Sequence, residues 1–332
     1  MNDPTEAALK EIASLLESHD QILVLGHKDP DGDTLGSSLA WTEAMRSQGR
    51  RTWLLVPSPL PPNYSFLPGW DQINHMPGTH DHPRLVFFFD AGNMARSGDM
   101  VKQIRKGSVI VNVDHHISNP SYGHVNLIEP DTSACAQVVL RLLDYLGVEV
   151  TATMATNLYT ALMTDTGGFR HENTNAKALE DGARMVWAGA KPGFIAERIY
   201  KSDPPSTVRL RARALADLKV DAEGDLVWSS VTKQMLEDCQ ATIHESESII
   251  DELNSVKGTR LAILFKQVDE RRTKVSIRTK GNMDASRLAQ EFGGGGHLRA
   301  AGCEIAEPVE QAVGHLLAAA HAALGSSGLR AR

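Results

Sequence analysis

The sequence predicts an α/β fold, in which an N-terminal, doubly wound and mainly parallel sheet precedes a smaller C-terminal α+β domain. Over the first half of the chain, apolar runs rich in β-branched residues alternate with helical patterns. These runs are continuously apolar, which is typical of parallel strands that are covered on both faces. The length of 332 residues is sufficient for two domains.

The elements of the first half follow from these patterns in chain order. Apolar runs predict strands at 21–26, 51–56, 84–90 and 108–114. Helical spacing predicts helices at 34–47, 132–146, 152–164, 175–188 and 192–201. Two adjacent prolines in KSDPPSTVRL interrupt the pattern, and a further helix is expected at 208–220. We interpret this last region as the connection between the domains.

The second half shows a mixed pattern of strands and helices. The expected strands lie at 225–231, 260–268 and 272–281, and the expected helices at 243–254, 285–292 and 309–324. The predicted organisation is a first domain at 1–188, a helical linker at 189–222, a second domain at 223–325 and a flexible tail at 326–332. Because ligands often bind where domains meet, we expect the active site in the interdomain cleft.

Charge is distributed unevenly along the chain. A net charge of −7 argues against a protein that coats long nucleic acid through a basic surface. The segment 257–300 is the exception, because it contains ten Lys/Arg against four Asp/Glu, a balance of +6 that leaves −13 for the rest. This basic segment is suited to hold phosphates.

The sequence also predicts a cytoplasmic protein with no membrane partner. Its first residues are acidic and amphipathic and do not resemble a signal peptide, and no apolar run is long enough to span a bilayer. The three cysteines, Cys135, Cys239 and Cys303, form no CxxC pair, which agrees with a reducing compartment.

Acidic and histidine residues follow three of the predicted strands and one predicted helix. Because the carboxyl ends of parallel strands meet at one edge of a sheet, we expect these side chains to converge there. Converging carboxylates repel one another, and divalent cations remove that repulsion. The residues are His27, Asp31, Asp33, Asp90, Asp114, His115, His116 and Asp165.

Six of these residues form a candidate ligand set for metal ions. They are too many for one catalytic ion with open positions, and they suit two ions that share a carboxylate. Mixed imidazole and carboxylate ligands favour Mn²⁺, with Mg²⁺, Co²⁺, Zn²⁺ and Fe²⁺ left open. The candidate ligands are His27, Asp31, Asp33, Asp90, His115 and Asp165.

The basic segment ends in a glycine-rich stretch, FGGGGHLRAAG, that suggests contact with an anion. Gly294, Gly295 and Gly296 allow the backbone to approach a ligand and to aim N–H groups at it, whereas the GK[ST] of a P-loop is absent. A flexible surface turn is the alternative interpretation. Neighbouring side chains add positive charge or hydrogen-bond donors, and we expect Arg278, His297 and Arg299 to contact phosphate or ribose.

Two arginines of the first domain lie close in sequence to the candidate metal ligands. Arg96 follows Asp90 by six residues, and Arg170 follows Asp165 by five. Each is a candidate for substrate binding, although a solvated surface arginine is the alternative.

These motifs resemble those of the DHH phosphoesterase superfamily, whose signature is Asp114-His115-His116 here. The first acidic cluster is similar to the opening motif of that family, and Asp90 and Asp165 are similar to its second and fourth motifs. The glycine-rich stretch resembles the signature of the associated DHHA1 domain, with Leu298 where the family often has proline. The resemblance extends over about 23–302.

The resemblance implies a role for each residue of the cluster. His27 and Asp31 would hold one ion, and a second group, Asp33, His115 and Asp165, would hold the other. Asp90 would bridge the two ions. Asp114 would orient the histidines and His116 would face the substrate, so that the catalytic residues are Asp90, Asp114 and His116.

The two-domain layout is similar to the bacterial oligoribonuclease and pAp-phosphatase group. This implies hydrolysis of RNAs of about two to five nucleotides to nucleoside monophosphates, and of pAp to AMP. The expected partners are therefore short RNA or small phosphorylated nucleotides, with no long nucleic acid and with homodimer formation left open. The alternatives are a phosphodiesterase for linear pApA or cyclic dinucleotides, a pyrophosphatase-like hydrolase, and a metal-stabilised nucleotide sensor without turnover.

Overall fold

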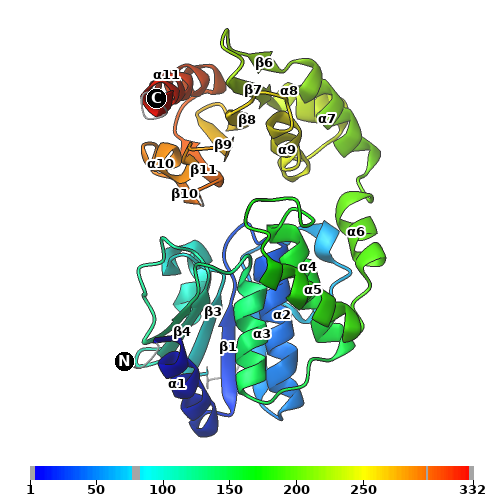
Figure 1. Cartoon of the computed structure of the whole chain (residues 1–332), viewed down its shortest axis with the longest axis vertical. Coiled ribbons are helices and arrows are strands. Elements are labelled where there is room, and N and C mark those ends of the chain that lie inside the picture. The colour runs from blue at the N-terminus through cyan, green and yellow to red at the C-terminus, as the bar shows by residue number, and fades with distance from the viewer. Residues whose placement is uncertain (1–3, 77–82, 297, 329–332) are drawn as a thin grey trace. The chain divides into compact units, whose positions relative to one another are not determined.

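The computed structural model describes residues 4–76, 83–296 and 298–328, and the chain divides into two compact units, Met1–Ser202 and Asp203–Arg332 (Figure 1). The boundary lies inside the stretch 189–222 that we expected to connect the domains. Helix α6 (Pro192–Tyr200) packs into the first unit through Ile195, and α7 (Pro205–Ala216) packs into the second through Leu210.

The first unit contains a five-stranded sheet in which every pairing is parallel. Its order is β2 (Arg51–Leu55), β1 (Gln21–Leu25), β3 (Leu85–Phe89), β4 (Val109–Asp114) and β5 (Val125–Ile128). The four predicted strands and the parallel sheet are confirmed. Edge strand β5 was not predicted, because it is short and its burial alternates instead of being continuous. The order reverses between β1 and β3, and such a switch point is where open α/β sheets bind ligands.

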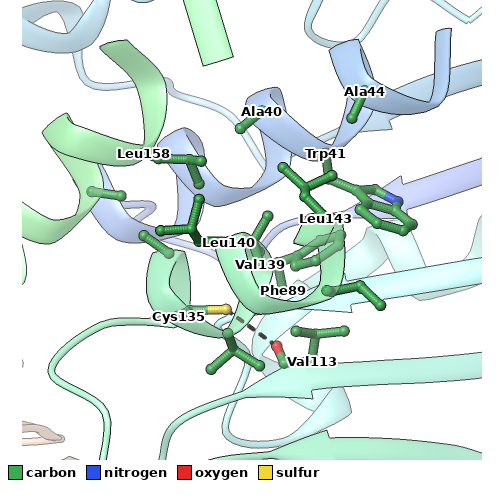
Figure 2. Close-up of a cluster of buried hydrophobic side chains, with 14 of the residues drawn as sticks. Ala40, Trp41, Ala44, Phe89, Val113, Cys135, Val139, Leu140, Leu143 and Leu158 are labelled. Carbon is green, nitrogen blue, oxygen red and sulfur yellow. Dashed lines mark hydrogen bonds between the residues drawn. The ribbon is translucent and has the colours of Figure 1, made fainter. Parts of the chain in front are cut away.

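The two faces of this sheet are covered differently. One core contains Phe87 and Phe89 of β3 together with side chains of four helices, which are α1 (Pro4–Ser18), α2 (Gly32–Ser47), α3 (Cys135–Tyr145) and α4 (Ala152–Asp165). In Figure 2, Trp41 of α2 lies beside Phe89. The opposite face contains Val86 and Phe88 and is covered by the 3₁₀ segment η3 (Met94–Gln103) and loops, where a doubly wound sheet would carry α-helices.

Helices α2 and α4 approach each other closely because glycines of α2 face α4. A Cβ atom on Gly36 would lie 2.3 Å from the carbonyl oxygen of Asn157, and one on Gly32 would lie 2.4 Å from Thr164 Oγ1. Asp33 lies in the first turn of α2 and Asp165 is the last residue of α4. The close packing therefore brings these two carboxylates together.

The second unit contains a six-stranded mixed sheet. Its order is β10 (Gly295–Gly296), β11 (Ala300–Ile305), β9 (Arg272–Thr279), β8 (Leu261–Asp269), β7 (Leu226–Val231) and β6 (Lys219–Val220). Strands β7 and β8 are parallel and the other pairs are antiparallel. Helices α10 (Ala285–Gln290) and α11 (Val309–Gly328) cover one face, and α7, α8 (Lys233–Cys239) and α9 (Ile249–Asn254) cover the other.

Three predicted helical segments differ from the structure. Helix α7 starts at Pro205, because proline is favoured in the first helical turn, and the end of the predicted 208–220 helix is strand β6. The predicted helix at 243–254 is divided into the 3₁₀ turn η4 (Ile243–Ser246) and α9. Helix α11 extends to Gly328, beyond the predicted end. Among the described residues, no helix is both long and apolar enough to cross a membrane.

Candidate metal centre

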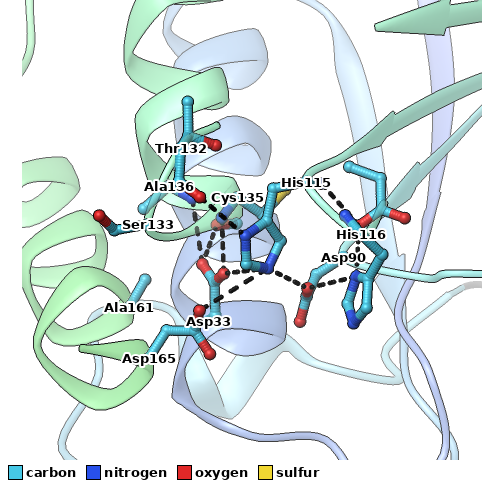
Figure 3. A network of polar contacts seen from close by, with 12 residues as sticks. Asp33, Asp90, His115, His116, Thr132, Ser133, Cys135, Ala136, Ala161 and Asp165 are labelled. Atoms are coloured by element: carbon cyan, nitrogen blue, oxygen red, sulfur yellow. Dashed lines mark hydrogen bonds and ion pairs between the residues drawn. The ribbon is translucent and has the colours of Figure 1, made fainter. Parts of the chain in front are cut away.

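The predicted acidic and histidine residues converge at the carboxyl ends of β1, β3 and β4. Figure 3 shows part of this cluster, with Asp33, Asp90, His115, His116 and Asp165 labelled. Asp90 directly follows β3, and Asp114 is the last residue of β4. Their potential ligand atoms form three overlapping groups, with all atoms of a group within 4.8 Å of one another. The groups are His27, Asp31 and Asp90; Asp33, His115 and Asp165; and Asp90, Asp114, His115 and His116.

The first group lies at the start of α2. His27 is buried, and its Nδ1 donates to the carbonyl of Lys28 at 2.7 Å, so Nε2 is the ring nitrogen that faces Asp90. Asp31 is exposed and is the N-cap of α2, where its Oδ1 accepts hydrogen bonds from the backbone N–H groups of Asp33 and Thr34. The side chain is thereby held beside His27 and Asp90.

Asp90 lies between the first two groups. Its Oδ2 is 3.6 Å from His27 Nε2 and accepts a hydrogen bond from Thr34 Oγ1 at 2.7 Å, whereas its Oδ1 is 3.5 Å from His115 Nε2. Burial opposes ionisation of the Asp90 carboxyl, but the hydrogen bonds of His115 and His27 hold its pKa well below the usual value. Its backbone φ of 56° is left-handed, which a short aspartate tolerates better than most residues.

The second group joins α2, α4 and the end of β4. His115 Nε2 is 3.7 Å from Asp33 Oδ2 and 3.7 Å from Asp165 Oδ2, and Nδ1 faces the carbonyl of Thr132 at 3.4 Å. Asp33 also accepts backbone hydrogen bonds from Cys135 and Ala136, at the N-terminus of α3. This helix has no side-chain cap of its own, so Asp33 supplies one from a distant part of the chain.

Electrostatics disfavour negative charge on the two carboxylates of this group in the absence of a compensating positive charge. Burial and the neighbouring Asp90 raise the pKa of Asp33 well above its usual value, and burial raises the pKa of Asp165 to about 7. Burial opposes protonation of His115, yet the surrounding carboxylates raise its pKa well above the usual value. Buried carboxylate oxygens and imidazole nitrogens that need compensating charge are a donor set that fits divalent cations.

Asp114 and His116 form a second layer behind Asp90. Asp114 Oδ1 accepts hydrogen bonds from the backbone N–H groups of His115 and His116, at 2.8 and 3.3 Å, and lies 2.7 Å from His116 Nδ1. Burial opposes ionisation of Asp114, but the hydrogen bond from His116 lowers its pKa. Burial opposes protonation of His116 as well, but its bond to Asp114 raises the pKa of the imidazole.

The structure also locates the arginines predicted to bind substrate in the first unit. Arg96 has a guanidinium nitrogen 3.5 Å from His27 Nε2, so this side chain lies at the cluster. Arg170 is exposed, and its Nε donates to the carbonyl of Gly167 in the loop after Asp165. Arg96 is therefore close to the predicted ligands, and Arg170 is held in an adjoining loop.

The predicted substrate-binding residues of the second unit gather at β9, β10 and β11. Arg278 donates to Asp251 Oδ1 at 3.2 Å, and Arg299 donates to the carbonyl of Met283 at 2.9 Å. Gly294 and Gly296 pack against β11, where an added Cβ would lie within 2.5 Å of a carbonyl oxygen, whereas a Cβ on Gly295 would meet nothing within 4 Å. His297 lies outside the described residues.

Sequence reasoning did not single out several residues that support the cluster. Thr34 donates to Asp90, Ser37 donates to Asp33 and Asn119 donates to Asp114. The only signal for Ser37 is its spacing of four residues from Asp33 on α2, and Thr34 and Asn119 show no signal beyond their closeness to Asp33 and to the Asp-His-His motif.

A cluster of carboxylates and imidazoles at the switch point of a parallel sheet, followed by a second domain with a basic strand, defines a metal-dependent hydrolase. The chain belongs to the DHH family: residues 21–164 match the DHH family N-terminal domain, and residues 232–326 match the DHHA1 domain. The resemblance noted from the sequence is thus confirmed. The phosphoesterases of this family depend on divalent metals.

Relatives of similar length support this assignment. The chain is 32% identical to the Bifunctional oligoribonuclease and PAP phosphatase NrnA of Thermus thermophilus, over 86% of this chain and 84% of that protein. It is 24% identical to the protein of the same name from Bacillus subtilis, over 89% and 92% of the two chains. The crystal structure of an exopolyphosphatase-related protein from Bacteroides fragilis superposes with a TM-score of 0.87 over 95% of each chain, at 25% identity.

Proposed function

We propose that this protein hydrolyses oligoribonucleotides of about two to five residues to nucleoside monophosphates, and pAp to AMP, with two bound Mn²⁺ ions. The observation that carries the proposal is the position of Asp90 between two ligand groups: it belongs to the group of His27 and Asp31, and its Oδ1 is 3.5 Å from His115 Nε2 of the other group. The names of the Thermus and Bacillus relatives support the same substrate class.

In this proposal, one ion would be held by His27 and Asp31. The other ion would be held by Asp33, His115 and Asp165, and Asp90 would be a ligand of both ions. When bound, such a pair of ions lowers the pKa of a water molecule and stabilises negative charge on the scissile phosphate. Imidazole among the ligands favours Mn²⁺ over Mg²⁺.

The remaining residues of the first unit act on the substrate. His116 Nδ1 donates to Asp114, so Nε2 is the ring atom that contacts the phosphate or serves the leaving oxygen. Arg96, which lies next to His27, contributes a guanidinium to the phosphate oxygens. Arg170 binds a more distant part of the substrate.

In the second unit, the basic strand β9 and the glycine-rich edge bind the rest of the nucleotide. Arg278 supplies positive charge, Arg299 and His297 supply donors, and the segment Gly294–Gly296 offers its backbone. The position of β10 at the edge of the sheet supports this role, because an edge strand has one side that no neighbouring strand occupies. The close packing of Gly294 and Gly296 against β11 explains part of the glycine content without any ligand.

We also propose that the protein acts in the cytoplasm. All three cysteines are buried and free, as expected in a reducing compartment.

The test is a turnover assay with purified protein and Mn²⁺ on a set of substrates. The set is RNA of two to ten nucleotides, long single-stranded RNA, pAp, pApA, a cyclic dinucleotide and pyrophosphate. We expect the fastest hydrolysis for short RNA and pAp, with an Asp90→Asn variant as the inactive control. A clear preference for a cyclic dinucleotide or for pyrophosphate would contradict the proposed substrate class. Two bound ions without turnover of any substrate would favour the nucleotide sensor.

A further inference from the structure

Three asparagines form a chain of hydrogen bonds that ends on Asp114. Asn112 is fully buried in β4, and its Nδ2 donates to Asn126 Oδ1 of β5 at 3.1 Å and to Asn119 Oδ1 at 3.0 Å. Asn119 Nδ2 in turn donates to Asp114 Oδ2. The mechanism above makes no use of this chain, although it reaches the carboxylate that contacts His116.

Backbone groups determine which way each amide faces. Asn119 Oδ1 accepts a hydrogen bond from the N–H of Ser121 at 2.9 Å, and Asn126 Oδ1 accepts one from the N–H of Gly123 at 2.9 Å. A backbone N–H can only donate, so the oxygen of each amide is identified without any choice of flip. The NH₂ of Asn119 must therefore face Asp114, and the NH₂ of Asn112 must face the two oxygens.

These contacts show which groups donate hydrogen bonds to the two oxygens of Asp114. Its Oδ2 accepts from Asn119, and its Oδ1 accepts from the backbone N–H groups of His115 and His116. An oxygen that accepts from two backbone N–H groups acts as an acceptor toward a third neighbour as well. His116 Nδ1, 2.7 Å from Oδ1, therefore carries the hydrogen of this bond, which fixes the orientation of the ring.

Asn119 also connects this layer to the segment that follows Asp90. Its Nδ2 is 3.4 Å from the carbonyl oxygen of Ala91, which also accepts a hydrogen bond from the Tyr122 hydroxyl at 2.9 Å. The same amide thus contacts the segments that follow both acidic motifs. This linkage stabilises the separation of 3.6 Å between Asp90 Oδ1 and His116 Nδ1.

We propose that Asn119 is a positioning residue that holds Asp114, and through it orients the His116 ring and places its hydrogen on Nδ1. This inference rests on the role proposed above for His116. The alternative is a purely structural role, in which Asn119 only stabilises the loop, because its Oδ1 and the N–H of Ser121 form an Asx turn.

Asn119→Asp separates these two interpretations. The variant keeps an oxygen for Ser121 and Asn112, so the turn is preserved, but it replaces the donor that faces Asp114 with a second carboxylate oxygen. Asn282→Asp is the matched control, because Asn282 is exposed in the second unit and undergoes the same change of charge. Asn119→Ala serves as a second variant in which no new charge is introduced.

Kinetics and metal content are measured on the Mn²⁺-loaded proteins with short RNA. We expect Asn119→Asp and Asn119→Ala to lower kcat by about 10–100-fold, the range typical of residues that support a metal site. KM and two bound ions per chain are retained, and Asn282→Asp matches the unmodified protein. An unchanged kcat in Asn119→Asp would overturn the proposal, and so would a loss of bound metal in proportion to the loss of kcat.

A spectroscopic readout separates this inference from the proposed function. NMR spectra are recorded on the ¹⁵N-histidine-labelled protein loaded with diamagnetic Mg²⁺. The ring signals of His116 are assigned as those that are absent from the spectrum of His116→Ala. We expect the signal of an Nδ1–H imidazole in the unmodified chain and a changed signal in the Asn119 variants. An Nε2–H signal in the unmodified chain would contradict the inference even if the enzyme were active, and the expected signal would support it even if no RNA were hydrolysed.

Discussion

At the scale of single residues, the position of Asp90 requires both a side chain that tolerates a left-handed backbone and a carboxylate that can contact two ligand groups. The residue follows β3 with a left-handed φ of 56° and is 2% exposed between His27 and His115. A short side chain tolerates that backbone, and a carboxylate offers two oxygens to two neighbouring ligand groups. A change at this position can therefore act through the backbone or through the ligand.

Asp90→Asn is expected to remove nearly all activity and to lower the bound metal below that of the unmodified protein, since an amide cannot serve as a shared anionic ligand. Asp90→Ala should do the same, with an additional loss of about 1–2 kcal/mol because alanine tolerates a left-handed backbone poorly. Metal analysis, kcat and thermal unfolding distinguish these effects. Retention of both ions and most of the activity in Asp90→Asn would contradict a bridging role.

His116→Ala should preserve metal binding and lower kcat. The ring faces Asp114 through Nδ1, and in our proposal its Nε2 serves the substrate and not an ion. Metal content and steady-state kinetics on short RNA test this expectation. Loss of one equivalent of metal in this variant would instead place His116 among the ligands.

At the scale of elements, the packing of α2 against α4 positions two carboxylates that lie far apart in the sequence. Gly36 faces the backbone oxygen of Asn157, and no larger residue fits there without a shift of one helix. Because Asp33 begins one helix and Asp165 ends the other, such a shift moves one carboxylate away from His115.

Gly36→Ala is expected to destabilise the first unit by about 1–3 kcal/mol, as overpacking typically does, and to weaken metal binding. Gly314→Ala is the matched control, since a Cβ at this exposed position of α11 meets nothing within 4 Å. That substitution should leave stability unchanged or raise it slightly. Thermal unfolding and metal titration provide the measurements. Equal behaviour of the two variants would show that α2 and α4 can separate without consequence for the site.

At the scale of the whole molecule, charge is divided between an acidic metal centre and a basic segment in the other unit. The segment 257–300 has a balance of +6, and the rest of the chain has −13. The acidic remainder is expected to repel a long polyanion more strongly than a short substrate.

The expected consequence is a limit on substrate length. We predict that kcat/KM is highest for RNAs of about two to five nucleotides and falls for longer single strands. Arg278→Ala and His297→Ala should flatten this preference and reduce catalysis as well as affinity, because binding energy from the second unit helps to align the phosphate. Arg271→Ala removes the same charge from the same segment and is the control. Equal or faster degradation of long RNA by the unmodified protein would contradict the prediction.

Much of the candidate site can be predicted from the sequence, because the candidate ligands lie at or near the ends of elements with a strong local pattern. Strands β1, β3 and β4 are mostly apolar and buried along nearly their whole length, and the carboxyl ends of parallel strands meet, so His27, Asp90 and His115 were expected together. The elements that were missed or misjudged, such as β5 and the start of α7, have short or mixed patterns.

By itself, the sequence determined the parallel sheet, the second α+β domain and the set of acidic and histidine residues, because periodicity and residue chemistry are local properties. Only the tertiary structure decided how these side chains are held. Asp33 caps α3, more than 100 residues away, Thr34 contacts Asp90, and Asn112 connects β5 to the loop that carries Asn119. Such hydrogen bonds join residues that are distant in the chain or lie in irregular loops, so the periodic patterns of the sequence do not predict them. Their geometry exists only once the strands and helices have packed.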